Sequence, residues 1–195
     1  MTHTVSQTVW PFGSLTPMKY GAILADPPWH YELYSAAGAA RSPQAHYETM
    51  TIGDIARLPV GQLAGPDCLL FLWSTWPHLQ QALNVMSNWG FTYKTGGAWV
   101  KRQRHHWQPA MGTGYVLRSA TEPFLIGTIG RPAIRDRAVR NVLIDAQRRE
   151  HSRKPPEARQ MIERLLPRAW CCELFAREPW PGHEVWGNQT EKFVS

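Results

Sequence analysis

The sequence lacks the features that mark secreted and membrane proteins. Its three cysteines, Cys68, Cys171 and Cys172, form no C-x-x-C pair, which argues against a disulfide framework or a cysteine zinc site and favours buried, reduced thiols. The longest fully apolar run, Cys68–Trp73, is too short to cross a bilayer. The N-terminal stretch has neither the basic nor the apolar region of a signal peptide. We therefore expect a soluble, cytoplasmic protein with no membrane partner.

Several common catalytic motifs are absent as well. The chain contains no G-x-G-x-x-G, G-x-x-x-x-G-K-S/T, G-x-S-x-G or H-E-x-x-H. It therefore lacks the sequence motifs of dinucleotide-binding and P-loop enzymes. The adjacent pair His105-His106 fits a polar surface loop better than a metal site, because neighbouring side chains on an extended loop diverge. Cys171 lies in an apolar stretch and fits the core better than the role of a nucleophile. No metal is expected.

Positive charge, by contrast, is abundant and concentrated. The 195-residue chain has a formal net charge of +6, and the stretch from Arg131 to Arg168 holds eleven lysines and arginines against five acids. This concentration favours a polyanionic partner, nucleic acid first, over the alternative of a solvated basic face. Tryptophan is also frequent, with ten residues; we expect most of them in the core and some as stacking surfaces.

Alternating strand and helix patterns predict a single α/β domain over residues 1–195 with a largely parallel sheet. The expected strands are 22–25, 67–74, 91–101, 141–146, 170–176 and 183–186, with two short strand segments in 115–127 that meet at 121–123. Helices are expected at 51–58, 77–89 and 154–166. Residues 1–19 should be irregular, 30–50 and 102–114 long loops at the active site, and 128–153 a mainly basic loop region. The glycines at 96–97 suggest a bulge.

The strongest functional signal lies in Tyr20–Trp29. Its apolar segment Ala22–Ala25 predicts a strand, and the two prolines that follow Asp26 do not continue a sheet. Asp26 should therefore sit on a stiff loop just past the carboxyl end of a strand, where ligands bind in open α/β sheets. The alternative is structural, with Asp26 capping a helix that has proline at its first position.

An acid and a proline carbonyl on such a loop suit methyl transfer to an exocyclic amine. The 6-amino group of adenine is a poor nucleophile, because its lone pair is delocalised into the ring. The Asp26 carboxylate and the Pro27 carbonyl can accept both amine hydrogens, hold the nitrogen towards tetrahedral geometry and aim its lone pair at a sulfonium methyl. Trp29 is then a candidate to stack on the base.

A set of segments in a fixed order points to a known family. The segments are ADPPW at 25–29, HYETMTIGDIARLPV at 46–60, LLFLWSTW at 69–76, NWGF at 88–91, WVK at 99–101, GTGYVLRSATE at 112–122, HSRKPPE at 151–157, MIERL at 161–165, ELFAR at 173–177 and WGNQ at 186–189. The chain resembles the MT-A-type family, named for the seventy-kilodalton catalytic subunit of the eukaryotic messenger-RNA adenine-N6 methyltransferase. The resemblance implies a Rossmann-like methyltransferase fold with a mostly parallel central sheet flanked by helices. It also implies a permuted motif order, in which the catalytic DPPW precedes the cofactor motifs.

The resemblance further implies a set of site residues. The catalytic set is Asp26, Pro27, Pro28 and Trp29. The cofactor S-adenosyl-L-methionine, which leaves as S-adenosyl-L-homocysteine, is expected to contact Asp26, Lys154, Glu173, Arg177, Asn188 and Gln189, with Lys154 on its carboxylate. The expected substrate residues near the acceptor adenine are Tyr47, Arg118, Ser119 and Glu122. No separate target-recognition domain is present, so two basic stretches, 102–107 with Arg102 and Arg104 and 131–149, are our candidates for binding the nucleic-acid backbone.

Alternatives remain for some of these residues. Tyr47 is equally suited to packing its loop, and Glu122 to being a surface charge. Glu173 lies in an apolar strand and needs partners, which ribose hydroxyls or Arg177 can supply. Pro179 and Trp180 replace a histidine and an asparagine of the eukaryotic enzyme, and the residue that binds the cofactor adenine has no clear match.

We expect methylation of adenine N6 in nucleic acid, with DNA ahead of RNA, because the compact chain is similar to prokaryotic and phage members and shows no RNA-binding appendage. A homodimer, or a heterodimer with a related subunit, is possible. A second hypothesis is a non-catalytic nucleic-acid-binding partner, which is disfavoured because Asp26 and Lys154 are both present. Methylation of protein amides, as by DPPY-like enzymes, is disfavoured because the motif ends in Trp29.

Overall fold

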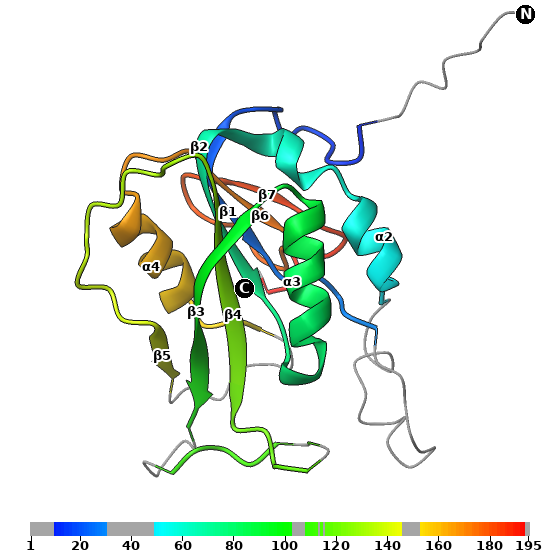
Figure 1. Ribbon diagram of the computed structural model, residues 1–195, viewed down its shortest axis with the longest axis vertical. Helices are drawn as coiled ribbons and strands as arrows, with labels where there is room; N and C mark the ends of the chain where they lie inside the picture. The colour runs from blue at the N-terminus through cyan, green and yellow to red at the C-terminus, as the bar shows by residue number, and fades with distance from the viewer. Residues whose placement is uncertain are drawn as a thin grey trace, which may run out of the picture.

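The computed structural model describes residues 10–30, 49–102, 108–112, 114, 116–145 and 153–193 (Figure 1). They form a seven-stranded sheet with the order β5-β3-β4-β2-β1-β6-β7. The strands are β1 Tyr20–Ala25, β2 Ala64–Trp73, β3 Thr92–Lys101, β4 Thr121–Ile129, β5 Val142–Asp145, β6 Cys171–Leu174 and β7 Glu184–Trp186. Only β4 runs against the others. The predicted α/β architecture with a mostly parallel sheet is confirmed.

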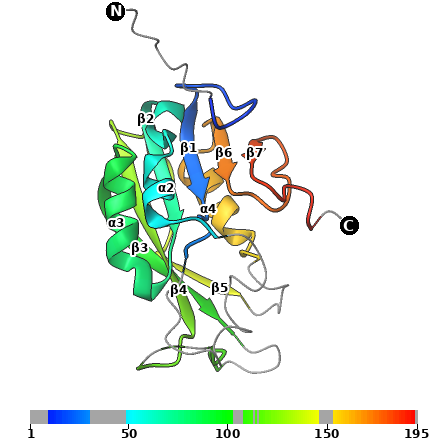
Figure 2. The same cartoon turned by 90° about the vertical axis from the view of Figure 1, so that its right-hand side faces the viewer.

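Helices cover both faces of this sheet. Helices α2 (Ile52–Arg57) and α3 (Leu79–Asn88) lie on one face, and α4 (Glu157–Leu165) lies on the other (Figures 1 and 2). The central strand β1 is buried on both sides, because Ile23 and Ala25 pack into the core under α2 and α3 while Ala22 and Leu24 pack into the core under α4. A strand enclosed in this way reads as a continuous apolar run in the sequence.

The chain changes direction across the sheet at β1. It proceeds from β1 to β2 on one side, builds the β4, β3 and β5 part of the sheet, and returns through α4 to β6 on the other side of β1. The carboxyl ends of β1 and β6 therefore flank the point where the strand order reverses. Ligands of open α/β sheets bind at such a point.

The structure corrects some predictions of local detail. Residues 121–129 form the single strand β4, and the described residues 116–120, where a first strand segment was predicted, belong to no strand. The irregularity in β3 lies between Tyr93 and Thr95 rather than at the glycine pair. The glycine at 97 serves close packing, because a Cβ there would lie 2.4 Å from Cζ of Phe124 and 2.1 Å from the carbonyl oxygen of Asn141. No described helix follows Asp26, so it is not a helix cap.

Two simpler expectations, the cap at the start of α2 and the buried thiols, are confirmed within the described residues. The Thr51 hydroxyl accepts a hydrogen bond from the N–H of Asp54 at the start of α2, as the sequence pattern predicts. The three cysteines are free and buried. None of the helices described is long and apolar enough to cross a membrane. The described part of the chain contains no group of three or more His, Cys, Asp or Glu residues that could hold a metal ion, and the pair His105-His106 lies outside it.

Candidate active site

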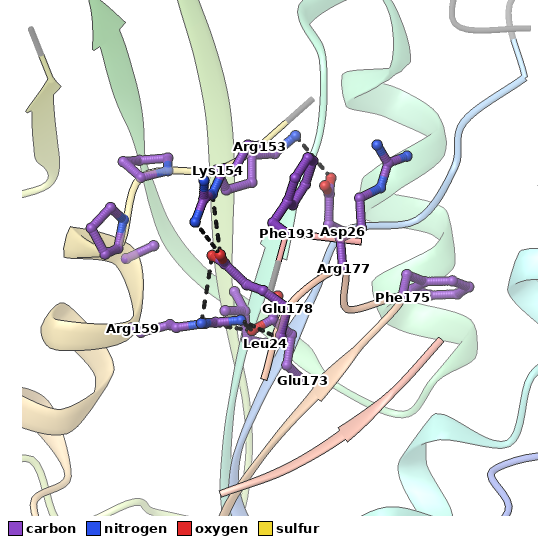
Figure 3. A pocket seen from close by; sticks show the side chains of 13 residues that line it. Leu24, Asp26, Arg153, Lys154, Arg159, Glu173, Phe175, Arg177, Glu178 and Phe193 are labelled. Carbon is purple, nitrogen blue, oxygen red and sulfur yellow. Dashed lines mark hydrogen bonds and ion pairs between the residues drawn. The ribbon is translucent and has the colours of Figure 1, made fainter. Parts of the chain in front are cut away.

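A pocket opens at the carboxyl ends of β1 and β6, against the start of α4 (Figure 3). About 410 Å³ of space lies between its walls, including space that is open to solvent. Its walls combine acids, cations and apolar groups: Leu24, Asp26, Arg153, Lys154, Pro155, Pro156, Ala158, Arg159, Glu173, Phe175, Arg177, Glu178 and Phe193. The pocket thus occupies the position where the strand order reverses.

A chain of four alternating charges runs from this pocket across the edge of the sheet. The Lys154 ammonium lies 3.0 Å from Oδ1 of Asp26 and 3.2 Å from Oε2 of Glu122, and the Lys101 ammonium lies 2.6 Å from Oε1 of Glu122. The side chains of Asp26, Lys154 and Glu122 are each about one-fifth exposed. The antiparallel direction of β4 makes this chain possible, because it brings the first residues of β4 to the edge where the other strands end.

The chain of charges acts on its two acids in different ways. Burial raises the pKa of Asp26 above its ordinary value, and Glu122 adds to this effect while Lys154 opposes it. Burial also disfavours the ionised form of Glu122, but Lys154 and Lys101 outweigh it, so that the pKa of Glu122 is lowered. Glu122 is therefore an ionised group that holds Lys154 in place rather than a surface charge.

Trp29 fixes the loop that carries Asp26. Its indole N–H donates to the carbonyl of Trp73 at 3.2 Å, and its ring stacks on His78 with centroids 5.9 Å apart and an interplanar angle of 19°. Nε2 of His78 lies 3.0 Å from the carbonyl oxygen of His30, so Nε2 carries the proton and Nδ1 accepts from the hydroxyl of Thr75. Burial lowers the pKa of His78, which favours this neutral form.

Backbone hydrogen bonds hold the two prolines of the loop. The Pro27 carbonyl accepts the N–H of Trp29 at 2.9 Å, and the Pro28 carbonyl accepts the N–H of Met50 at 3.0 Å. A carbonyl oxygen has two lone pairs, so the Pro27 carbonyl retains the capacity to accept a second donor. The loop is rigid and anchored on two sides, as a preorganised acceptor must be.

Glu173 faces the pocket from the buried strand β6. Nε of Arg159 donates to its carboxylate at 2.7 Å, and the same guanidinium also donates to the carbonyls of Glu178 and Pro179. Burial raises the pKa of Glu173 to about 7, although Arg159 opposes the shift. The ion-pair partner of this buried acid is thus Arg159 on α4, whereas the sequence had suggested Arg177.

The segment after β7 is held against the pocket by close backbone packing. Phe175, directly after β6, has a φ of +62°, a left-handed conformation that is uncommon for a phenylalanine and often found at functional sites. A Cβ at Gly187 would lie 2.8 Å from the backbone nitrogen of Ala176, so only glycine fits there. Farther along, the N–H of Phe193 donates to the carbonyl of Arg177, which brings Phe193 to the pocket wall.

The structure brings together some, not all, of the predicted site residues. Asp26, Lys154, Glu173 and Arg177 line the same pocket, and Glu122 joins them through Lys154. Asn188 and Gln189 instead line a separate hollow with Thr190, Glu191 and Lys192. Arg118 and Ser119 precede β4 at the same edge of the sheet, and Arg102 follows β3 there. Tyr47 and Arg104 lie outside the described residues, as do 103–107 and 146–149 of the two basic stretches.

Sequence reasoning missed several residues of the site. Arg153 pairs with Glu178 at 2.7 Å, Arg159 pairs with Glu173, and Lys101 anchors Glu122. Lys101 ends the matched segment WVK and offered a signal, but the pairing of β3 with β4 was needed to place it beside Glu122. The arginine partners carry no local sequence signal, since they depend on how α4 packs against β6.

Comparison with known proteins identifies the family. The sequence profile of the MT-A70 family matches residues 20–189, so the chain belongs to the MT-A70 family. The predicted resemblance is confirmed, and the class is that of methyltransferases of the adenine-N6 type.

The relatives differ in how much of their own length the chain covers. It is 30% identical over 196 residues to the type II methyltransferase M.MunI of Mycoplasma sp, with 90% of this chain and 80% of that protein aligned. It is 35% identical over 176 residues to the N(6)-adenosine-methyltransferase MT-A70-like protein of Arabidopsis thaliana, and 32% identical over 178 residues to the human N(6)-adenosine-methyltransferase catalytic subunit METTL3. Those matches cover 87% and 89% of this chain but only 24% and 28% of the plant and human proteins.

Proposed function

We propose that the protein transfers the methyl group of S-adenosyl-L-methionine to the 6-amino group of adenine in DNA. The observation that carries this proposal is the position of Asp26. It lies on a stiff, anchored loop at the carboxyl end of β1, and its carboxylate faces both the pocket and the chain of charges. Family membership supplies the reaction class, and the geometry supplies the groups that would perform it.

The Asp26 carboxylate and the Pro27 carbonyl would accept the two hydrogens of the amine. Their fixed separation on the loop holds the nitrogen lone pair directed into the pocket, where the cofactor, when bound, supplies an electrophilic methyl group. Formation of the new N–C bond would break the S–CH₃ bond of the cofactor, whose electron pair would stay on sulfur in S-adenosyl-L-homocysteine. The nitrogen would then be positively charged and would lose one hydrogen as a proton. Asp26 is the nearest acceptor for that proton, and its raised pKa suits the role.

The chemistry of the pocket fits this cofactor. The cofactor carries an ammonium, a carboxylate, a ribose diol and an apolar base, and the pocket offers a partner for each kind of group. Glu173 and Glu178 are acceptors for hydroxyl and ammonium hydrogens, Arg177 and Lys154 are cations for the carboxylate, and Phe175 and Phe193 are apolar walls. Asn188 and Gln189 would reach the cofactor only from the neighbouring hollow, so we assign them a peripheral role.

DNA is favoured over RNA by the extent of the alignments. The chain matches most of the type II methyltransferase, whereas it matches about a quarter of the adenosine methyltransferases. The nucleic-acid backbone would be bound by cations at the carboxyl edge and by the exposed arginines Arg135, Arg137 and Arg140 that follow β4. A homodimer, or pairing with a related subunit, would extend this surface.

The test is transfer of tritiated methyl from S-adenosyl-L-methionine to duplex DNA, single-stranded DNA or RNA, followed by digestion to nucleosides. We expect label in N6-methyladenine from DNA, and a loss of about 10³-fold in rate for Asp26→Asn, because this change removes a charge aligned with the reacting amine. Asp54→Asn, at an exposed carboxylate on α2, is the matched control and should retain the wild-type rate.

The non-catalytic alternative predicts a different pattern. In that case the chain would bind nucleic acid but incorporate no label on any substrate, and the cofactor would not raise its melting temperature. Label in RNA alone would instead assign the chain to RNA methylation. Label in a protein would overturn the nucleic-acid proposal.

A further inference from the structure

The indole that was expected to stack on the substrate is not available for that role in this structure. Trp29 is only 4% exposed, and both its ring and its N–H are already engaged by His78 and Trp73. A different tryptophan presents an open face at the same edge. Trp76, just beyond the carboxyl end of β2, is 48% exposed.

Trp76 is held in place although it is exposed. Its indole N–H donates to the hydroxyl of Thr121, the first residue of β4, at 2.8 Å. The backbone supports the same register, because the N–H of Ser74 donates to the carbonyl of Pro123. A large aromatic side chain that is fixed at its polar atom while its ring faces solvent has the form of a stacking platform, since it loses little conformational freedom on binding.

The position of Trp76 suits a base beside the target adenine rather than the target itself. Successive residues of a strand point to opposite faces of a sheet. Glu122 points towards Lys154 and Asp26, so Thr121, and Trp76 bonded to it, lie on the other side of β4. An adenine that reaches Asp26 is therefore separated from the Trp76 ring by the end of β4, and a neighbouring nucleotide of the same strand can lie over it.

The surroundings of Trp76 fit a nucleic-acid strand. Ser119 and Arg118 lie two and three residues before Thr121, and both are exposed. Between β3 and β4, the described residues 108–112 and 116–120 extend past the edge of the sheet in both views (Figures 1 and 2), and the exposed ones include Met111 and Leu117. A cation beside an exposed indole and aliphatic side chains is the combination with which proteins bind unpaired strands, the cation contacting phosphate and the ring contacting a base.

We propose that Trp76 is the residue on which an unpaired base adjacent to the target adenine stacks. This inference rests on the proposed function, and it implies that the protein binds an opened or single strand at the methylation site. Stacking on an indole tolerates any base, so Trp76 would contribute affinity and local strand opening rather than sequence preference.

Binding of a mixed-sequence single-stranded oligonucleotide, followed by fluorescence anisotropy, tests the proposal without need for catalysis. We expect Trp76→Ala to raise the Kd about 10-fold and Trp76→Phe less than about 3-fold, because one base–aromatic stack is lost or kept. The matched control is Trp170→Ala, which removes an exposed tryptophan at the opposite edge of the sheet and should leave the Kd unchanged. The salt dependence of the Kd should stay the same in Trp76→Ala, since no phosphate contact is removed.

Abasic nucleotides then locate the stacked base. Once the methylated adenine of an oligonucleotide is known, the effect of Trp76→Ala should disappear when the nucleotide next to it is abasic, on one side, and persist when the target nucleotide is abasic. The reverse result would place the target itself on Trp76 and overturn the assignment to its neighbour.

Three other outcomes would also overturn the inference: equal Kd values for Trp76→Ala and wild type, an equal loss in Trp170→Ala, or a changed mass of Trp76→Ala in sedimentation, which would assign the indole to a protein contact. Absence of methylation in the wild type would reject the proposed function while leaving the binding result intact, so the two failures are distinguishable.

Discussion

The two ends of the strands carry similar residues but differ in chemistry. The carboxyl edge is the side of the sheet where β1, β2 and β6 end, and the amino edge is the side where they begin. Each edge has a lysine–glutamate pair at 2.6 Å, Lys101 with Glu122 at the carboxyl edge and Lys19 with Glu184 at the amino edge. Each edge also has an exposed tryptophan. At the amino edge the glutamate has one further partner, the hydroxyl of Tyr20, and the pocket described above lies at the other edge.

At the carboxyl edge the pair continues into a site. Glu122 reaches Lys154, Lys154 reaches Asp26, and Asp26 lines the pocket between β1 and β6. The difference comes from topology, because the crossover through α4 delivers Lys154 only to the edge where β1 and β6 end. An ion pair alone therefore does not indicate a functional site; what matters is the number of chain segments that converge on it.

The largest expected contrast between the edges comes from removing their lysines. Lys154→Met leaves the two acids Asp26 and Glu122 partly buried without this shared cation, so the pKa of Asp26 should rise further and its carboxylate should lose its alignment. We expect kcat/KM to fall about 100-fold, in line with the cost of misplacing a catalytic group. Because more Asp26 is then protonated at a given pH, the remaining rate should recover as the pH is raised from 6 to 9.

Lys19→Met is the matched change at the amino edge, and its kcat/KM should stay within about twofold of wild type because Lys19 contacts no residue of the pocket. A comparable loss in both variants would show that general destabilisation, and not the chain of charges, causes the effect. Melting temperatures of both variants, measured in the same buffer, separate these causes.

Much of the carboxyl edge was predictable from the sequence, because its signals are local. Pro27 after a short apolar run places Asp26 at the end of a strand, and the proline pair after Lys154 places that lysine at the start of a helix. The order of these motifs along the chain identified the family. Strand and helix positions could also be predicted, because the periodicity of apolar residues is a local signal too.

The rest depends on contacts between distant segments. No pattern in residues 121–129 shows that β4 runs antiparallel, yet this direction brings Glu122 to the active edge. The ion pair between Arg159 and Glu173 depends on the packing of α4. Trp29 and Trp76 differ in burial, which a sequence motif does not show. Asn188 and Gln189 match the family in sequence but lie in a neighbouring hollow.

The pH response of the two edges should also differ, and in opposite directions. Glu173 in the pocket has a pKa raised to about 7, so between about pH 4.5 and 7 the folded chain holds a proton that the unfolded chain has lost. Its contribution to stability is therefore fully present below pH 4.5 and is lost as the pH rises through 7. Between pH 5.5 and 8 the free energy of unfolding should fall by about 2 kcal/mol because of Glu173, and Glu173→Gln should not show this fall. Urea unfolding at the two pH values provides the measurement.

Cofactor binding offers a second measurement on the same group. Ribose hydroxyls that donate to Glu173 favour its ionised form, so we expect the affinity for S-adenosyl-L-methionine to increase as the pH rises from 6 to 8, and to increase less in Glu173→Gln. Calorimetric titration at these pH values provides the check. A cofactor affinity that is equally pH-dependent in both proteins would place the titrating group elsewhere, with Asp26 the next candidate.

The smallest expected effect belongs to Glu184 at the amino edge. A hydrogen bond from Lys19 lowers its pKa, with the hydroxyl of Tyr20 assisting, so its contribution to stability is present above about pH 4.5 and is lost as the pH falls through its lowered folded-state pKa. Glu184→Gln keeps an oxygen acceptor for Tyr20 and removes only the charge, so the free energy of unfolding at pH 7 should fall by about 0.5 kcal/mol, as for a partly exposed ion pair. At a pH well below this lowered folded-state pKa, the variant and the wild type should become equally stable. A loss well above 1 kcal/mol, or any change in methylation rate, would mean that the amino edge is coupled to the site through β1 and that the two edges are not independent.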